Sequence, residues 1–132
     1  MNAVRSDQVP SRQRFTIAQV NAGATILPAI AGYKYRLVEC EAVSVGGAAA
    51  AVTTVDILAT QSTSSVKLVA FAQASLTQST VLNCGASGAA VLADGASFVA
   101  NDVNTAITIG KTGSAVTTAT HIDVILSYAV EA

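Results

Sequence analysis

The sequence predicts an all-β protein, an antiparallel β-sandwich or jelly roll of about eight strands with an extended N-terminal arm. Apolar and polar residues alternate in almost every patterned segment of the 132-residue chain, and the residue types there suit a pleated sheet. Glycine-containing turns separate these segments at regular spacing, and no amphipathic helix longer than a turn or two is visible. Short strands spaced in this way are typical of sandwiches and jelly rolls.

The C-terminal segment 120–130 gives the clearest strand pattern, with Ile122 and Val124 facing inward and Asp123 facing outward. A second clear strand is expected over residues 103–109. Further strands are expected at residues 15–20, 24–30, 33–45, 52–60, 65–73, 80–84 and 97–100. Turns are expected at residues 31–32, 46–47, 85–88, 94–95 and 110–114.

The strand expected over residues 33–45 changes the side of its apolar residues partway along. Tyr35 and Leu37 share one face, whereas Cys40 and Ala42 have the opposite parity. A parity change within one extended run indicates an inserted residue. We therefore expect a β-bulge near residues 37 and 38.

Residues 66–71 are apolar at both parities, with Val66 and Leu68 on one and Val69 and Phe71 on the other. This pattern predicts a strand that is covered on both faces. We expect the core to cover one face and a neighbouring subunit to cover the other. Val69 and Phe71 are therefore the candidate residues for an oligomer interface.

The first fourteen residues have no apolar periodicity and predict a flexible arm (1–14), followed by a single sandwich domain (15–132). The arm contains three of the seven basic residues, Arg5, Arg12 and Arg14. Arginines form charge-assisted hydrogen bonds, and an extended backbone can add a strand to an exposed sheet edge. We expect these three arginines to bind a partner surface or an adjacent subunit.

Charged residues make up only 11% of the chain, against about 25% in an ordinary globular domain. The apolar residues are mostly small, with 26 Ala and 17 Val. A surface with so few charges is typical of a subunit that is covered by other protein. The net charge of −1 gives no preference for nucleic acid or an anionic membrane, and no apolar run is long enough to span a bilayer.

Three motifs invite a catalytic interpretation, and each has a simpler structural one. Gly110-Lys111-Thr112 matches only the end of a phosphate-binding loop, because Thr105 stands where the motif needs its first glycine. His121 is the one histidine, and it lies on the outer side of a strand. Glu39 and Glu41 share a strand face, which is more typical of a solvated surface than of a glycosidase pair. We expect no catalytic residue and no small-molecule substrate.

Metal and cofactor sites are not indicated either. One histidine and two cysteines 44 positions apart fit no zinc spacing. Asp94, Asp102 and Asp123 lack the clustering of a site for a hard cation. Cys40 and Cys84 are more typical of buried thiols than of a disulfide, since no secretory signal precedes them. We expect no metal and no cofactor.

The stretch from Val20 to Val38, VNAGATILPAIAGYKYRLV, resembles a recurrent segment of tailed-bacteriophage virion proteins. In that segment an apolar strand ending in Pro-Ala-x-x-Gly is followed by a basic and apolar strand and then by a Gly-Ala tract. Residues 92–98 and the closing strand 121–128 are similar to the same group. The resemblance covers most of the chain from about residue 15.

The resemblance implies a small jelly-roll module, usually a homotrimer, that is assembled in the host cytoplasm and displayed on the virion. Its most direct implication is a head decoration (cement) protein that binds the major capsid protein on the outer capsid surface. Attachment to the tail or neck is the nearest variant. A receptor-binding or glycan-binding module at the tip of a tail fibre is the second hypothesis, and a small hydrolase is the third. Three Tyr and no Trp favour the first, because recognition tips are rich in aromatic anchors.

Overall fold

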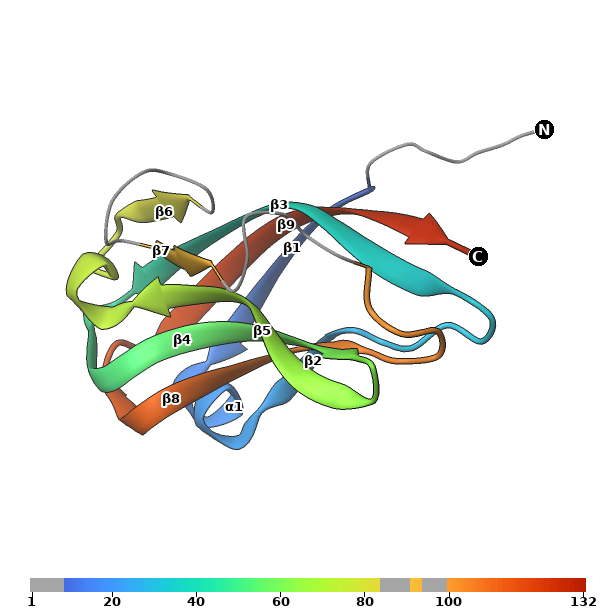
Figure 1. Ribbon diagram of the computed structural model, residues 1–132. Helices are drawn as coiled ribbons and strands as arrows, with labels where there is room; N and C mark the ends of the chain where they lie inside the picture. The colour runs from blue at the N-terminus through green and yellow to red at the C-terminus, as the bar shows by residue number, and fades with distance from the viewer. Residues whose placement is uncertain (1–8, 84–90, 94–99) are drawn as a thin grey trace.

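Two antiparallel sheets pack face to face in the computed structural model, which describes residues 9–83, 91–93 and 100–132 (Figure 1). The four-stranded sheet contains, in spatial order, β1 (Val9–Thr16), β9 (His121–Glu131), β3 (Lys34–Val45) and β6 (Val81–Asn83). The five-stranded sheet contains, in spatial order, β2 (Ala24–Leu27), β8 (Ile107–Thr118), β4 (Ala49–Gln61), β5 (Ser64–Ala72) and β7 (Val91–Ala93). The predicted all-β sandwich is confirmed.

The strand pairs show how the chain is wound. β4 and β5 form a hairpin, and outside this hairpin β3 pairs with β6, β2 with β8 and β1 with β9. The chain is therefore a long antiparallel ribbon with the β4–β5 hairpin at its tip, and successive pairs lie alternately in the two sheets. This is the winding of an eight-stranded jelly roll. β7 adds a further short strand beside β5.

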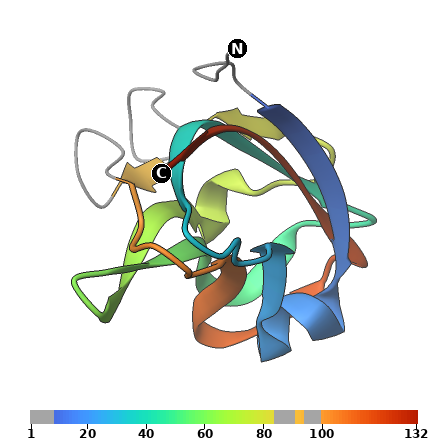
Figure 2. The ribbon, with the colours of Figure 1, turned by 90° about the vertical axis from the view of Figure 1, so that its right-hand side faces the viewer.

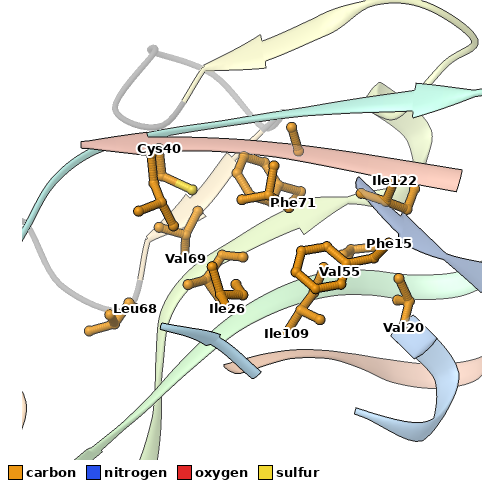
Figure 3. Close-up of a cluster of buried hydrophobic side chains, with 14 of the residues drawn as sticks. Phe15, Val20, Ile26, Cys40, Val55, Leu68, Val69, Phe71, Ile109 and Ile122 are labelled. Atoms are coloured by element: carbon orange, nitrogen blue, oxygen red, sulfur yellow. The ribbon is translucent and has the colours of Figure 1, made fainter. Parts of the chain in front are cut away.

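The core lies between the sheets and is built from alternate residues of the long strands (Figure 3). From β9, Ile122 and Val124 point inward, as the alternation predicts. Small residues such as Cys40 and Ala42, both fully buried, let the sheets approach closely. The largest fully buried apolar side chains are those of Phe71, Ile57, Leu76, Ile107, Ile109, Ile122 and Leu126.

The bulge expected in β3 is present. The register of β3 against β9 shifts between Leu37 and Glu39, which leaves Val38 as the extra residue. Val38 is exposed, and from Cys40 onward the opposite parity faces the core. The extra residue therefore accounts for the parity change in the sequence.

A second bulge explains the two-sided apolar pattern of β5. Its register against β4 shifts at Leu68, because Lys67 pairs with Leu58 and Val69 with Ile57. Val66, Val69 and Phe71 consequently point to the same side of the sheet and pack in or against the core. The expected cover by a neighbouring subunit is therefore wrong, because the strand is buried within a single chain.

Val69 and Phe71 were expected at an oligomer interface, and both are fully buried in the core instead. Figure 3 shows the two side chains inside the sandwich, among residues from both sheets. Their side chains are not available to a partner.

Residues 9–14, which were expected to belong to a flexible arm, form most of β1. This strand pairs with β9 along its whole length, from Val9 opposite Tyr128 to Thr16 opposite His121. Figure 2 shows β1 and β9 side by side at the edge of the sandwich. Its inward positions lack an apolar pattern because Ser11 and Gln13 occupy two of them, and Gln13 Nε2 donates to the Ile26 carbonyl at 2.6 Å. Residues 1–8, which include Arg5, lie outside the described residues.

The strand expected over residues 15–20 is replaced by the end of β1 and the helix α1 (Ile17–Ala22). Thr16 and Gln19 form a reciprocal capping box, in which each side chain accepts a hydrogen bond from the backbone N–H of the other residue. This pair satisfies two backbone donors that would otherwise be unpaired at the helix start. Local capping thus overrides the β pattern here.

The turn expected at residues 110–114 is also wrong, because β8 continues through it. β8 pairs with β4 there, and Gly113, which has a φ of 89°, lies opposite Val52. The register of the two strands shifts on both sides of this pair. The strand begins only at Ile107, since residues 103–106 form a loop. Asn101 holds this loop, and its side chain accepts from the Tyr35 N–H and donates to the Thr105 carbonyl. Of the strand expected over residues 97–100, residues 97–99 lie outside the described residues.

Replacing Phe71→Ala is expected to lower the free energy of unfolding by about 3 to 5 kcal/mol, because it leaves a cavity in the core. The matched control is Val81→Ala, since Val81 is 55% exposed at the edge strand β6. That control is expected to change stability by no more than about 0.5 kcal/mol. Chemical unfolding of the two variants measures both values. Equal, small effects would contradict the placement of Phe71 in the core.

Candidate interaction surface

The outer side of the four-stranded sheet carries most of the charge of this protein. Side chains alternate along each strand, so residues between the buried positions of β9 point away from the core, together with their paired neighbours on β1 and β3. We call this surface the charged face. It contains eight of the fifteen charged residues of the sequence. They are Arg12, Arg14, Lys34, Arg36, Glu39, Glu41, Asp123 and Glu131.

Asp123 is the best-buried charge on this face, with 5% of its side chain exposed. Arg14 donates to both of its oxygens, from Nε at 2.7 Å and from Nη2 at 3.0 Å. Arg12 reaches the same carboxylate only at 3.6 Å. The hydrogen bonds from Arg14 lower the pKa of Asp123 below its ordinary value, and the charges of Arg14 and Arg12 add to that effect against the opposing effect of burial.

A second ion pair lies at the far end of β9. Arg36 Nε donates to Glu131 Oε2 at 2.6 Å, which links the start of β3 to the end of β9. The hydrogen bond from Arg36 lowers the pKa of Glu131. Both side chains are substantially exposed, so water weakens this pair relative to a buried one.

Arg12, Ile125 and Glu41 lie in one row across three neighbouring strands. Ile125 on β9 pairs with Arg12 on β1 and with Glu41 on β3. Two strand spacings, or about 10 Å, therefore separate the Cα atoms of Arg12 and Glu41. Within the described part of the chain, neither Glu41 nor the neighbouring Glu39 forms an ion pair. The charged face is thus basic along β1 and acidic along the middle of β3.

The five-stranded sheet has a different polar cluster around Asp56, which is 1% exposed. Thr54 and Thr112 donate hydroxyl hydrogen bonds to its two oxygens at 2.7 and 2.6 Å, and Lys67 Nζ lies 3.8 Å away. These contacts link β4, β5 and β8. Because the carboxylate is shielded from solvent and hydrogen-bonded on both oxygens, it stabilises the contact between these strands.

An open groove of about 480 Å³ lies where α1 and β2 meet β8 and β4. Two of its polar side chains already have partners inside the protein. Asn21 exchanges two hydrogen bonds with the backbone of Val116, and Lys111 Nζ donates to the Gly113 carbonyl. A ligand in this groove would meet mainly small side chains and backbone.

The other residues and motifs singled out in the sequence lie in strands or outside the described residues. Gly110-Lys111-Thr112 lies within β8 rather than before a helix. His121 is half-buried at the start of β9, with Nδ1 3.0 Å from the Thr120 hydroxyl. Cys40 is buried, and Cys84 and Asp94 lie outside the described residues. Among the described residues no group of three or more His, Cys, Asp or Glu side chains is arranged to hold a metal ion.

One exposed feature had no signal in the sequence pattern. Ile30, Tyr33 and Val103 are each about 40% exposed, and they lie on two loops at the same end of the sandwich (Figure 1). Asn104 ties the loops together, because its side chain accepts from the Gly32 N–H at 2.6 Å and its N–H donates to the Tyr33 carbonyl. We call these three residues the apolar tip. Only the contact between two distant loops brings them together.

No protein-family model, curated protein sequence or solved structure matches this chain. No helix among the described residues has the length and apolar character needed to cross a membrane.

Replacing Asp123→Asn is expected to lower the free energy of unfolding at neutral pH by about 1 to 2 kcal/mol, a modest effect because Arg14 is half exposed. The pKa of Asp123 is lower in the folded protein than in the unfolded chain, where it is about 4. The carboxylate therefore stabilises the fold above about pH 4 and loses this effect as the pH falls through the lower folded value.

Urea unfolding of the wild type and of Asp123→Asn, repeated from neutral to strongly acid pH, measures this difference. The two stabilities should converge in acid. A difference that stays constant over the whole range would show that the charge of Asp123 does not contribute.

Proposed function

We propose that this chain is a non-enzymatic structural protein of a bacteriophage particle, a head decoration (cement) protein that binds the outer capsid surface and stabilises the shell. The observation that carries the proposal is the uneven distribution of charge over a jelly-roll fold. Of the charged residues that the structure describes, eight lie on the charged face and only Asp56, Lys67, Asp102 and Lys111 lie elsewhere. Much of the remaining described surface can therefore be buried against protein with little cost from desolvating charge.

The polar groups of the other clusters support this role. The carboxylate of Asp56 is buried beneath two threonine hydroxyls, and Asp102 accepts from the backbone N–H groups of Ser62 and Thr63. These groups hold the fold rather than face a substrate. Under the proposal the partners are the major capsid protein and further copies of this chain, with a homotrimer as the order that the resemblance implies. The location is the virion, after assembly in the host cytoplasm.

The apolar tip favours a second candidate, a receptor-binding or glycan-binding module of a tail fibre or neck. Tyr33 is 45% exposed on a loop that hydrogen bonds hold in place, and a rigid exposed tyrosine is a common anchor of recognition surfaces. The tip contains no tryptophan and only this one aromatic residue. The decoration role therefore remains the first proposal.

The proposed function predicts that the purified chain binds shells that lack it and raises the temperature at which those shells open. Shells and bound chain are separated by sedimentation, and the bound copies are counted against the major capsid protein. Tyr33→Ser distinguishes the two candidates, because only the tail-fibre candidate requires Tyr33 for binding to host cells. Failure of the wild type to bind at micromolar concentration, together with loss of binding to host cells by Tyr33→Ser, would favour the tail-fibre candidate.

Two deletions separate the N-terminal residues from β1. Deleting residues 2–14 removes most of β1 and the Arg14–Asp123 pair, and is expected to lower the melting temperature strongly. Deleting residues 2–8 leaves every pairing of β1 with β9 in place, and is expected to keep the melting temperature. Shell binding by the shorter deletion then tests the segment that contains Arg5. Equal melting temperatures for the two deletions would contradict the role of β1 in the fold.

A further inference from the structure

We propose that two copies of this chain associate through their charged faces, about a two-fold axis that runs along β9. The inference rests on the proposed function, in which this chain associates with further copies of itself. It adds the surface that two copies use and the symmetry of their contact. The partner is a second copy of this chain, because the charged face is complementary to itself. A two-fold contact gives particles with an even number of copies, so trimers formed through another surface would join in pairs.

The row formed by Arg12, Ile125 and Glu41 sets the geometry. Ile125 lies on the central strand, with the basic residue one strand away on one side and the acidic residue one strand away on the other. Rotation by half a turn about an axis along β9 places Ile125 opposite its own copy. The same rotation places Arg12 of each copy opposite Glu41 of the other, so both ion pairs form at once.

The neighbouring rows fit the same arrangement. In the next row Asp123 pairs with Arg14 on one side and with Val43 on the other. The rotation brings the aliphatic part of Arg14 onto Val43 of the second copy, while its guanidinium keeps Asp123. In the row on the other side, Ser127 pairs with Pro10 on β1 and with Glu39 on β3. The rotation places Pro10 of each copy opposite Glu39 of the other, and both side chains are exposed in the single chain. The rotation also places Asp123 and Glu131 opposite their own copies. Each of these carboxylates is already paired with an arginine of its own chain, so no unpaired like charges face each other there.

The single chain leaves these particular charges with poor partners. Arg14 occupies both oxygens of Asp123, so Arg12 has only a 3.6 Å contact, and its side chain is 72% exposed. Glu41 forms no ion pair with any described residue. Association gives Arg12 and Glu41 a partner each, and the contact of Ile125 with its copy removes water around them. Such a contact is weakened by salt, because it depends on exposed charges.

Charge reversal tests the contact. Arg12→Glu and Glu41→Arg are each expected to weaken the association constant of two copies by about tenfold or more, because each puts like charges opposite each other. The double variant Arg12→Glu/Glu41→Arg should recover the wild-type constant to within about threefold. Lys111→Glu is the matched control, since it changes the charge by the same amount as Arg12→Glu away from the charged face, and should have no effect.

Sedimentation velocity of the full chain at micromolar concentration, at low and at physiological ionic strength, measures these constants. The wild type should sediment as an even multiple of 13.2 kDa and dissociate as salt is added. An equimolar mixture of the two single variants should form mixed pairs, because each supplies the charge that the other lacks. Circular dichroism and the melting temperature of each variant confirm that it folds.

A wild type that is monomeric, or that forms only a trimer unaffected by the single variants, would overturn the two-fold contact. Shell binding by a monomeric wild type would leave the proposed function standing without this contact. Pairing that follows the charge rules in a chain that binds no shell would support the contact and count against the decoration role. Single variants that bind shells normally but no longer pair would show that the two surfaces are separate.

Discussion

The alternation of side chains along β9 is the constraint on which the rest of the structure depends. Because β9 is paired on both sides, its inward residues Ile122, Val124 and Leu126 bring β1 and β3 onto the core. Its outward residues, Asp123 and Ile125, build the centre of the charged face at the same time. A shift of one residue in this register would bury Asp123 in the apolar core and expose Ile122. The sheet pairing and the surface chemistry are therefore set by a single register.

The long strands and the first bulge could be predicted from sequence because both depend on local parity. The parity change at Leu37 predicted a bulge, and the structure has one there. The apolar run around Leu68 also contains a bulge, but its pattern predicts burial on two faces equally well, because a bulge and a two-sided strand look alike in a short apolar run.

Elements that depend on distant partners could not be predicted in this way. β1 is stabilised by backbone pairing with β9 and by Arg14, whose carboxylate partner lies 109 positions later in the chain. The pattern of residues 9–14 predicts neither interaction. α1 had a usable signal, because Thr16 followed by Gln19 three positions later is a capping box. Of the expected binding residues, Arg12 and Arg14 do lie on the candidate surface, where the fixed strand β1 presents them. Glu41 and Ile125 were missed because only the sheet places them in a row with Arg12.

The scarcity of charge in this chain and the concentration of that charge on one sheet are the basis of the proposal that its surfaces face other protein. The central claim is that these surfaces are covered by the head of a virus particle. Under the proposal a phage encodes this chain, and electron cryomicroscopy of its purified virions tests that claim most directly. The account predicts density for the jelly roll on the outer surface of the capsid. Density for the jelly roll only at the tail or its fibres, or none on the particle, would contradict it.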